Sequence, residues 1–179
     1  MNNKDEEMLD LVNEQDEVIG EVLKVKANQD PSLWHREIAV ILFDNDNNVL
    51  FQKRSKNKTV SPGKWTISCA GHVTKGMTPE EAAHMELKEE LGIDANLIFL
   101  GKVLYRGQNE THFTYWYIGK YTGEPICIQK EEVERYAFLN RKGLMELIKD
   151  DERYSGSVKW ACRFWEGEFD EKIRILQSE

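Results

Sequence analysis

Three glutamates near the middle of the chain have the type and spacing that a metal site needs. Glu86, Glu89 and Glu90 belong to a segment, 71–93, with a helical pattern. At about 100° per residue they fall within an arc of roughly 100° on one helical face. Like charges on one face repel, and a hard divalent cation such as Mg²⁺ would relieve that repulsion. A solvated glutamate-rich face is the alternative, but the Gly-His pair before the helix and its marked ends favour the metal site.

A basic stretch upstream has side chains suited to holding a diphosphate. Arg54, Lys56, Lys58 and Lys64 surround a turn at 61–63. Arginine can bind two phosphate oxygens at once, and lysine supplies a point charge. We predict that Arg54 and Lys58 bind the diphosphate and that Lys56 and Lys64 are solvated. A basic loop that only keeps the protein in solution is the alternative.

The helix that must position the glutamates is marked at both ends. Thr78 can cap its amino terminus, Pro79 suits the first turn, and Glu81 can complete a capping box with Thr78. Gly92 can end the helix in a left-handed conformation. The sequence therefore predicts a helix over 79–91.

Apolar runs bounded by turn residues predict strands on both sides of this helix. Residues 9–24 are expected to form a β-hairpin. The other expected elements are strands at 37–43, 49–51, 65–70, 97–105, 112–121 and 135–139, and helices at 141–149 and within 156–176. Strands interrupted by helices predict an α+β or α/β sandwich. We expect Trp160, Phe164 and Trp165 to pack the last helix onto the core rather than to stack on a base.

Length and composition limit the function classes. A chain of 179 residues is long enough for one domain with a sizeable core. Its net charge of −8 argues against a nucleic-acid partner bound by the whole surface. Cys69, Cys127 and Cys162 are few and widely spaced, which argues against a disulfide framework or a zinc site. The sequence has no secretory signal and no apolar run of membrane-spanning length, so we expect a cytoplasmic protein with no membrane partner.

Segment 71–93 resembles the Nudix box, Gly-x5-Glu-x7-Arg-Glu-U-x-Glu-Glu-x-Gly-U, in which U is aliphatic. The matching residues are Gly71, Glu86, Leu87, Glu89, Glu90, Gly92 and Ile93. The resemblance implies an α/β fold, the Nudix α/β/α sandwich with a mixed sheet, here preceded by the N-terminal hairpin, as a single domain over 1–179. It further implies that Glu86, Glu89 and Glu90 bind Mg²⁺ or Mn²⁺, that one of these carboxylates helps to activate water, and that the Gly71 carbonyl is a further ligand.

Met77 and Met85 stand where the box has Glu and Arg. In the family pattern those two residues resemble an ion pair that ties the loop to the helix. Replacing a buried pair with apolar residues of similar volume is often neutral or stabilising, and Met is adaptable. We therefore expect the two methionines to replace an ionic contact with an apolar one. Decay of a site that is no longer needed is the alternative.

Segments 51–73 and 131–140 resemble the branch of Nudix proteins related to isopentenyl-diphosphate isomerase. By that resemblance, Arg54 and Lys58 match the spacing at which the isomerases hold their diphosphate. Glu110 resembles an acidic active-site position. His35 and His72 match metal-binding histidines, and a structural role for each is the alternative. The place of a third histidine is taken by Asn28, so a complete isomerase-type metal site is not expected. Glu131 and Glu132, a second candidate acid, are expected in a solvated turn before a strand.

Three functions remain open: a metal-dependent hydrolase of a diphosphate linkage, an isoprenoid diphosphate isomerase, and a binding module without chemistry. The isomerases carry a proton-transferring Cys immediately before the Gly-His pair, and they lack the full set of three box glutamates. Here that position is Ala70, and its neighbour Cys69 would point to the opposite face of a strand. Both differences favour hydrolysis of a small-molecule diphosphate. A homodimer is left open.

Overall fold

A seven-stranded mixed sheet forms the centre of the computed structural model, which describes residues 6–58 and 60–178. Its main path is β5-β4-β3-β8-β7, with β6 added to β3 and β9 added to β4. Strands β3 and β8 are parallel, and the other pairs are antiparallel. The strands are β3 (His35–Phe43), β4 (Val49–Arg54), β5 (Trp65–Thr66), β6 (Cys69–His72), β7 (Leu97–Arg106), β8 (Thr111–Lys120) and β9 (Val133–Leu139).

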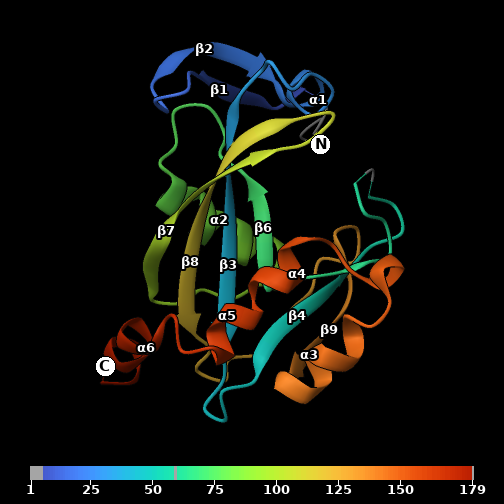
Figure 1. Cartoon of the computed structure of the whole chain (residues 1–179), viewed down its shortest axis with the longest axis vertical. Coiled ribbons are helices and arrows are strands. Elements are labelled where there is room, and N and C mark those ends of the chain that lie inside the picture. Colours follow the sequence, from blue (N-terminus) through green and yellow to red (C-terminus); the bar gives the residue numbers. More distant parts are fainter. Residues whose placement is uncertain (1–5, 59, 179) are drawn as a thin grey trace.

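Helices cover both faces of this sheet, so the expected α/β/α sandwich is confirmed. Helix α2 (Pro79–Leu91) lies behind the sheet in Figure 1, and α4 (Ser157–Trp160) and α5 (Cys162–Trp165) lie in front. Alternate residues of β3 face the two layers because side chains alternate along a strand. Ile38, Val40 and Leu42 pack in the α2 core, and Ala39, Ile41 and Phe43 in the core under the C-terminal helices.

The expected N-terminal hairpin is also confirmed. Strands β1 (Met8–Val12) and β2 (Val18–Leu23) pair antiparallel and lead into α1 (Lys24–Ala27), at the top of Figure 1. Asp16 in the connecting turn is buried and accepts hydrogen bonds from Arg36 Nε at 2.7 Å and Lys102 Nζ at 2.6 Å, and from the Tyr115 hydroxyl. These bonds attach the hairpin to β3, β7 and β8. Whether residues 1–179 act as one domain stays a prediction.

The strand expected at 65–70 is two short strands. Ser68 lies between β5 and β6 and is fully buried. Its hydroxyl accepts from the Leu42 amide at 2.8 Å and donates to the Leu50 carbonyl at 2.6 Å. The side chain thus replaces part of the ladder between β3 and β4, whose backbones pair only at Phe43 and Val49.

The helix expected within 156–176 is divided into three shorter ones. The segment forms α4, α5 and α6 (Asp170–Ser178), after α3 (Arg141–Leu147) and a short 3₁₀ turn, η2 (Asp151–Arg153). Tight bonds such as Ala161 N to Val158 O at 3.1 Å turn the chain, and Gly167 adopts a left-handed φ of 78°. The path follows aromatic packing: the Trp160 ring stacks on Trp116 at 3.7 Å between centroids and on Phe169 at 5.3 Å. Trp160 therefore packs against two other aromatic rings, as expected for a packing residue.

Within the described residues, no helix is both long enough and apolar enough to span a membrane.

Candidate functional site

Helix α2 begins and ends where the sequence indicates. Thr78 Oγ1 accepts from the Glu81 amide at 3.2 Å, and the Glu81 carboxylate accepts from the Thr78 amide at 2.8 Å, which completes the capping box. Gly92 ends the helix with a left-handed φ of 69°. With its ends fixed in this way, the helix presents Glu86, Glu89 and Glu90 to one cavity of about 1340 Å³. These three side chains are called the box carboxylates below.

Gly71 allows the first box carboxylate to come against the sheet. A Cβ at Gly71 would lie 2.3 Å from both Cδ and Oε1 of Glu86, which is closer than real Cβ contacts. Gly71 pairs with Ile38 of β3, so the Glu86 carboxylate rests on the end of β6, on the α2 side of the sheet. The structure therefore brings together two of the predicted metal ligands, Gly71 and Glu86.

Glu90 is the most deeply buried box carboxylate. It is 4% exposed, and its Oε2 accepts from Gln52 Nε2 at 2.7 Å and from Cys69 Sγ at 3.2 Å. Burial raises the pKa of Glu90, while the bonds from Gln52 and Cys69 act in the opposite direction. Burial and the nearby Glu90 and Glu86 raise the pKa of the Cys69 thiol well above its usual value, so the thiol keeps its proton and donates.

Glu86 shares the unfavourable surroundings of Glu90. Burial, and then the charge of Glu90, raise the pKa of Glu86 to about 8. Glu89 is exposed and lines the same cavity. Two desolvated carboxylates that repel each other, with a third beside them, are an oxygen donor set that a hard divalent cation would stabilise. The residues present therefore fit Mg²⁺ or Mn²⁺.

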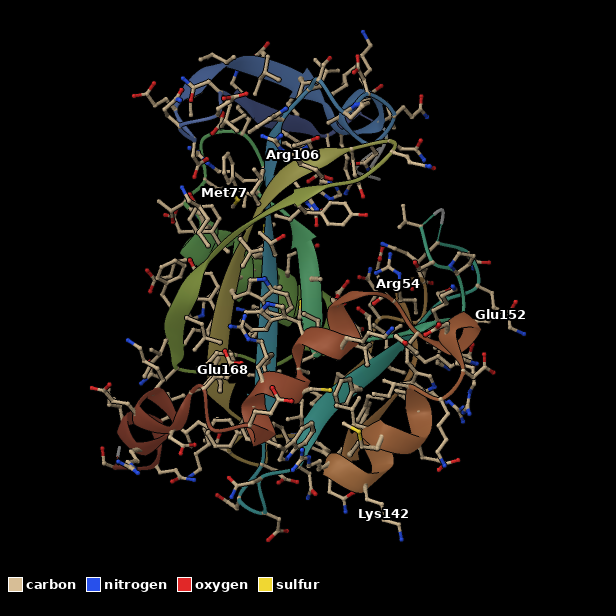
Figure 2. All side chains as sticks on the ribbon, viewed as in Figure 1. Arg54, Met77, Arg106, Lys142, Glu152 and Glu168 are labelled. Atoms are coloured by element: carbon tan, nitrogen blue, oxygen red, sulfur yellow. The ribbon has the colours of Figure 1, made fainter. Side chains whose placement is uncertain are left out.

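Arg54 and Lys58, called the cationic clamp below, line the same cavity. Arg54 is the last residue of β4, to the right of β6 in Figure 2, and its Nε donates to the Val60 carbonyl at 3.0 Å. Lys58 is partly buried because its ammonium pairs with the Glu132 carboxylate. The charges of Lys58 and Arg54 both lower the pKa of Glu90, so the clamp lies near the buried end of the box carboxylates.

The expectation of a solvated turn is wrong for Glu132, which is 8% exposed and lines the cavity. Its carbonyl accepts from the Ser55 amide at 2.8 Å, and its own amide donates to Gln129 O at 2.9 Å. A bulge in the β4–β9 ladder pairs Arg54 with Val133 and turns Glu132 inward. Glu131 is exposed, as expected.

A second group of ionisable side chains lies on the other face of the sheet. His35, Glu37, His72 and His112, called the histidine cluster below, come from three neighbouring strands. Glu37 Oε2 lies 2.8 Å from His112 Nδ1, and Glu37 Oε1 lies 3.4 Å from His72 Nε2 and 3.9 Å from His35 Nε2. Asn28 Oδ1 lies 2.9 Å from His72 Nε2. Asn28 therefore contacts the cluster from the position where a third histidine was sought.

Burial and the neighbouring charges shift the pKa values within this cluster in different directions. Burial alone would raise the pKa of Glu37, but the neighbouring imidazoles hold it well below its usual value. Burial lowers the pKa of His72 to about 3, whereas Glu37 overcomes the effect of burial and raises the pKa of His112. His35 Nε2 is buried without a hydrogen-bond partner among the described residues. Neutral imidazoles beside a carboxylate are the donor set that divalent transition metals prefer, and ligand atoms of His35, Glu37 and His72 lie within 4.8 Å of one another.

Glu110 lies with the histidine cluster rather than with the clamp. It lines the same cavity, and burial, followed by the charge of Glu37, raises its pKa. Glu37 and His112 were not predicted as site residues from the sequence. The two-residue spacing of His35 and Glu37 on a strand could have indicated a shared face, whereas His112 joins them only through the parallel pairing of β3 with β8.

The strand around the Gly-His pair has the expected alternation. Cys69 packs in the α2 core, and Ala70 packs toward the C-terminal helices and lines the cavity. Met77 and Met85 are half-buried and line the cavity as well. Met77 packs against the α2 core. Their expected mutual apolar contact stays a prediction.

The family model for the NUDIX domain matches residues 33–161, which include β3 to β9, helix α2 and the box. The chain therefore belongs to the Nudix family, and within it to the branch that resembles isopentenyl-diphosphate isomerases. Membership of this family supports the conclusion that the chain is an enzyme that acts on a diphosphate. Members of the family use divalent metals.

Named relatives fall into two groups. The chain is 37% identical over 150 residues to isopentenyl-diphosphate Δ-isomerase 2 of Photorhabdus laumondii, covering 81% of this chain and 84% of that protein. It is 33% identical over 144 residues to an uncharacterised Nudix hydrolase of Listeria monocytogenes, covering 80% and 85%. A crystal structure of a Deinococcus radiodurans protein superposes with a TM-score of 0.75 at 23% identity, covering 89% of this chain and 99% of that one, and supports the fold.

Proposed function

We propose that this chain is a divalent-metal-dependent hydrolase that cleaves a diphosphate linkage in a nucleoside-diphosphate-type or other small-molecule substrate. The observation that carries the proposal is that the box carboxylates and the cationic clamp line a single cavity, where the charges of Lys58 and Arg54 act on Glu90. A metal at an acidic cluster and cations beside it are the two parts that phosphoryl chemistry requires.

Each residue has a role in this proposal. Glu86, Glu89 and Glu90, with the Gly71 carbonyl, would hold Mg²⁺ or Mn²⁺, which would neutralise the developing charge and make the attacking water more acidic. Arg54 and Lys58 hold the non-reacting phosphate oxygens. One box carboxylate takes the proton of the attacking water. Glu110 contacts the substrate from the side of the histidine cluster.

An isoprenoid diphosphate isomerase is the second candidate, and the names of the relatives favour it. The cavity argues against it. Ala70 presents a methyl group where the isomerases resembled here carry a thiol, and no cysteine lines the cavity among the described residues. Cys69 faces Glu90 from the opposite side of β6. A binding module without chemistry is the third candidate, and the changes at Met77 and Met85 are the feature that favours it.

One screen separates the three. Purified protein with Mg²⁺ or Mn²⁺ is offered a panel of nucleoside diphosphates, nucleotide sugars, dinucleotides and isopentenyl diphosphate, and phosphate or nucleotide release is measured beside deuterium exchange into isopentenyl diphosphate. We expect metal-dependent release from at least one substrate and no enzymatic exchange. Exchange without release would establish the isomerase, and the lack of both would favour the binding module.

A further inference from the structure

One oxygen of Glu90 receives two hydrogen bonds from residues that are themselves buried. Gln52 Nε2 on β4 and Cys69 Sγ on β6 both donate to Glu90 Oε2, at 2.7 Å and 3.2 Å. Gln52 is 1% exposed and Cys69 is 0% exposed. The two donors lie on different strands, β4 and β6, so the tertiary fold brings them to a single atom.

The fold alone does not account for Gln52. Its Oε1 atom is buried and has no hydrogen-bond partner among the described residues. A buried amide with an unpaired oxygen costs stability, and an apolar side chain of similar length would avoid that cost. The neighbouring positions of this core are apolar, among them Leu50, Leu87 and Leu91. A polar residue kept at a net cost beside an acidic site is typical of a residue that serves the site.

Cys69, like Gln52, is a hydrogen-bond donor to Glu90 in apolar surroundings. Its neighbours in the α2 core, such as Val40 and Leu87, are apolar, and a thiol could be accommodated there as a small apolar group. The single S–H bond instead points at the oxygen that Gln52 also contacts. Residues that orient a metal ligand in this way are known to tune metal affinity strongly.

We propose that Gln52 and Cys69 are positioning residues that hold Oε2 of Glu90 and leave Oε1 to bind the metal through one oxygen only. This inference rests on the metal site of the proposed function.

A carboxylate that offers a single oxygen also affects which metal binds. Mg²⁺ and Mn²⁺ accept single carboxylate oxygens in a small octahedral shell, whereas Ca²⁺ readily takes both oxygens of a carboxylate. Holding one oxygen of Glu90 therefore favours Mg²⁺ and Mn²⁺ over Ca²⁺.

The test is titration calorimetry of the whole chain with Mn²⁺ and with Ca²⁺. The variants are Gln52→Met, which keeps length and removes the donor, Cys69→Ala, and Cys69→Ser, which restores a donor. Cys162→Ala is the matched control, because Cys162 is half-buried in the other core. We expect Gln52→Met and Cys69→Ala each to weaken Mn²⁺ binding by about 10- to 100-fold. Binding of Ca²⁺ should change less, and Cys69→Ser and Cys162→Ala should stay near the wild type.

Other outcomes would overturn either the proposed metal site or the positioning role alone. If the wild type binds neither cation, the metal site of the proposed function fails, and this inference fails with it. If the wild type binds Mn²⁺ and the folded Gln52→Met and Cys69→Ala variants bind it equally well, only the positioning role fails. If Cys69→Ser loses as much affinity as Cys69→Ala, or if Mn²⁺ and Ca²⁺ weaken equally, the effect is one of packing and the positioning role is wrong.

Discussion

The carboxylate of Glu86 occupies the space where a side chain at Gly71 would begin, since a Cβ there would lie 2.3 Å from Glu86 Oε1. The first residue of the box and the first of the three box carboxylates are thus in direct contact. The contact explains why a glycine is needed at this position although its backbone is an ordinary strand conformation. It also connects β6 to the proposed metal site.

Gly71→Ala should therefore push the Glu86 carboxylate out of place. We expect metal affinity and turnover to fall by about 10-fold or more, because a displaced ligand loses its geometry. Gly20→Ala is the control, since an added Cβ there would meet only Leu11 at an ordinary 3.8 Å. Calorimetry with Mn²⁺ on both variants checks the prediction. Equal affinity in Gly71→Ala and the wild type would show that Glu86 does not need this position.

The metal-free protein should lose stability as pH rises from about 5 to about 8. The pKa of Glu86 is about 8 in the folded chain against an ordinary 4.5, so the folded state binds a proton in this window that the unfolded state lacks. That stabilisation is complete below the pKa of the unfolded state and is lost as pH rises through the pKa of the folded state, with a slope of at most about 1.4 kcal/mol per pH unit.

Glu86→Gln should flatten the curve of stability against pH, and Mg²⁺ should restore stability at pH 8. Thermal melts of metal-free protein across this range provide the measurement. An unchanged slope in Glu86→Gln would contradict the assignment.

The two clamp residues should respond differently to removal. Arg54→Ala should raise KM for a diphosphate about 10- to 100-fold with little change in melting temperature, because the hydrogen bond from the arginine to the Val60 carbonyl is exposed to solvent. Lys58→Ala should raise KM and also lower the melting temperature, since it removes the ammonium group beside buried Glu132.

Adding Glu132→Gln to Lys58→Ala should recover the melting temperature and leave KM high. Steady-state kinetics and melting curves on the single and double variants separate the two effects. If Lys58→Ala changes neither value, Lys58 does not belong to the clamp.

Met77 and Met85 should be energetically coupled if they replace an ionic contact. Met85→Arg alone should destabilise the fold by about 1–3 kcal/mol, because it places a charge among half-buried groups. Adding Met77→Glu should recover part of that loss. A denaturation cycle on the wild type, both single variants and the double variant measures the coupling. Additive effects, together with no turnover on any diphosphate, would favour the binding module.

The features that could be predicted from the sequence depend on residues that lie close together along the chain. Helix α2 runs over 79–91, as expected, because Thr78, Pro79, Glu81 and Gly92 act within a few residues of its ends. The hairpin and most strands follow from alternating apolar runs. The acidic face of α2 follows from helical geometry alone, which is why the box carboxylates were identified as a group.

The remaining features depend on contacts between distant segments. Ser68 interrupts a strand because its hydroxyl bonds to β3 and β4, and no local pattern indicates this. Glu132 turns inward through a bulge shared with β4. His112 reaches Glu37 only because β8 runs parallel to β3. Each of these depends on which strands become neighbours.

The central claim is that water attacks a phosphorus atom at a metal held by Glu86, Glu89 and Glu90. Turnover of the best diphosphate substrate in ¹⁸O-labelled water, followed by mass spectrometry of the products, tests it most directly. We predict that the wild type with Mg²⁺ places one labelled oxygen in a phosphate-containing product, and that Glu90→Gln reduces the rate by about 100-fold or more. Turnover without label in any phosphate product, or an unchanged rate in Glu90→Gln, would contradict the account.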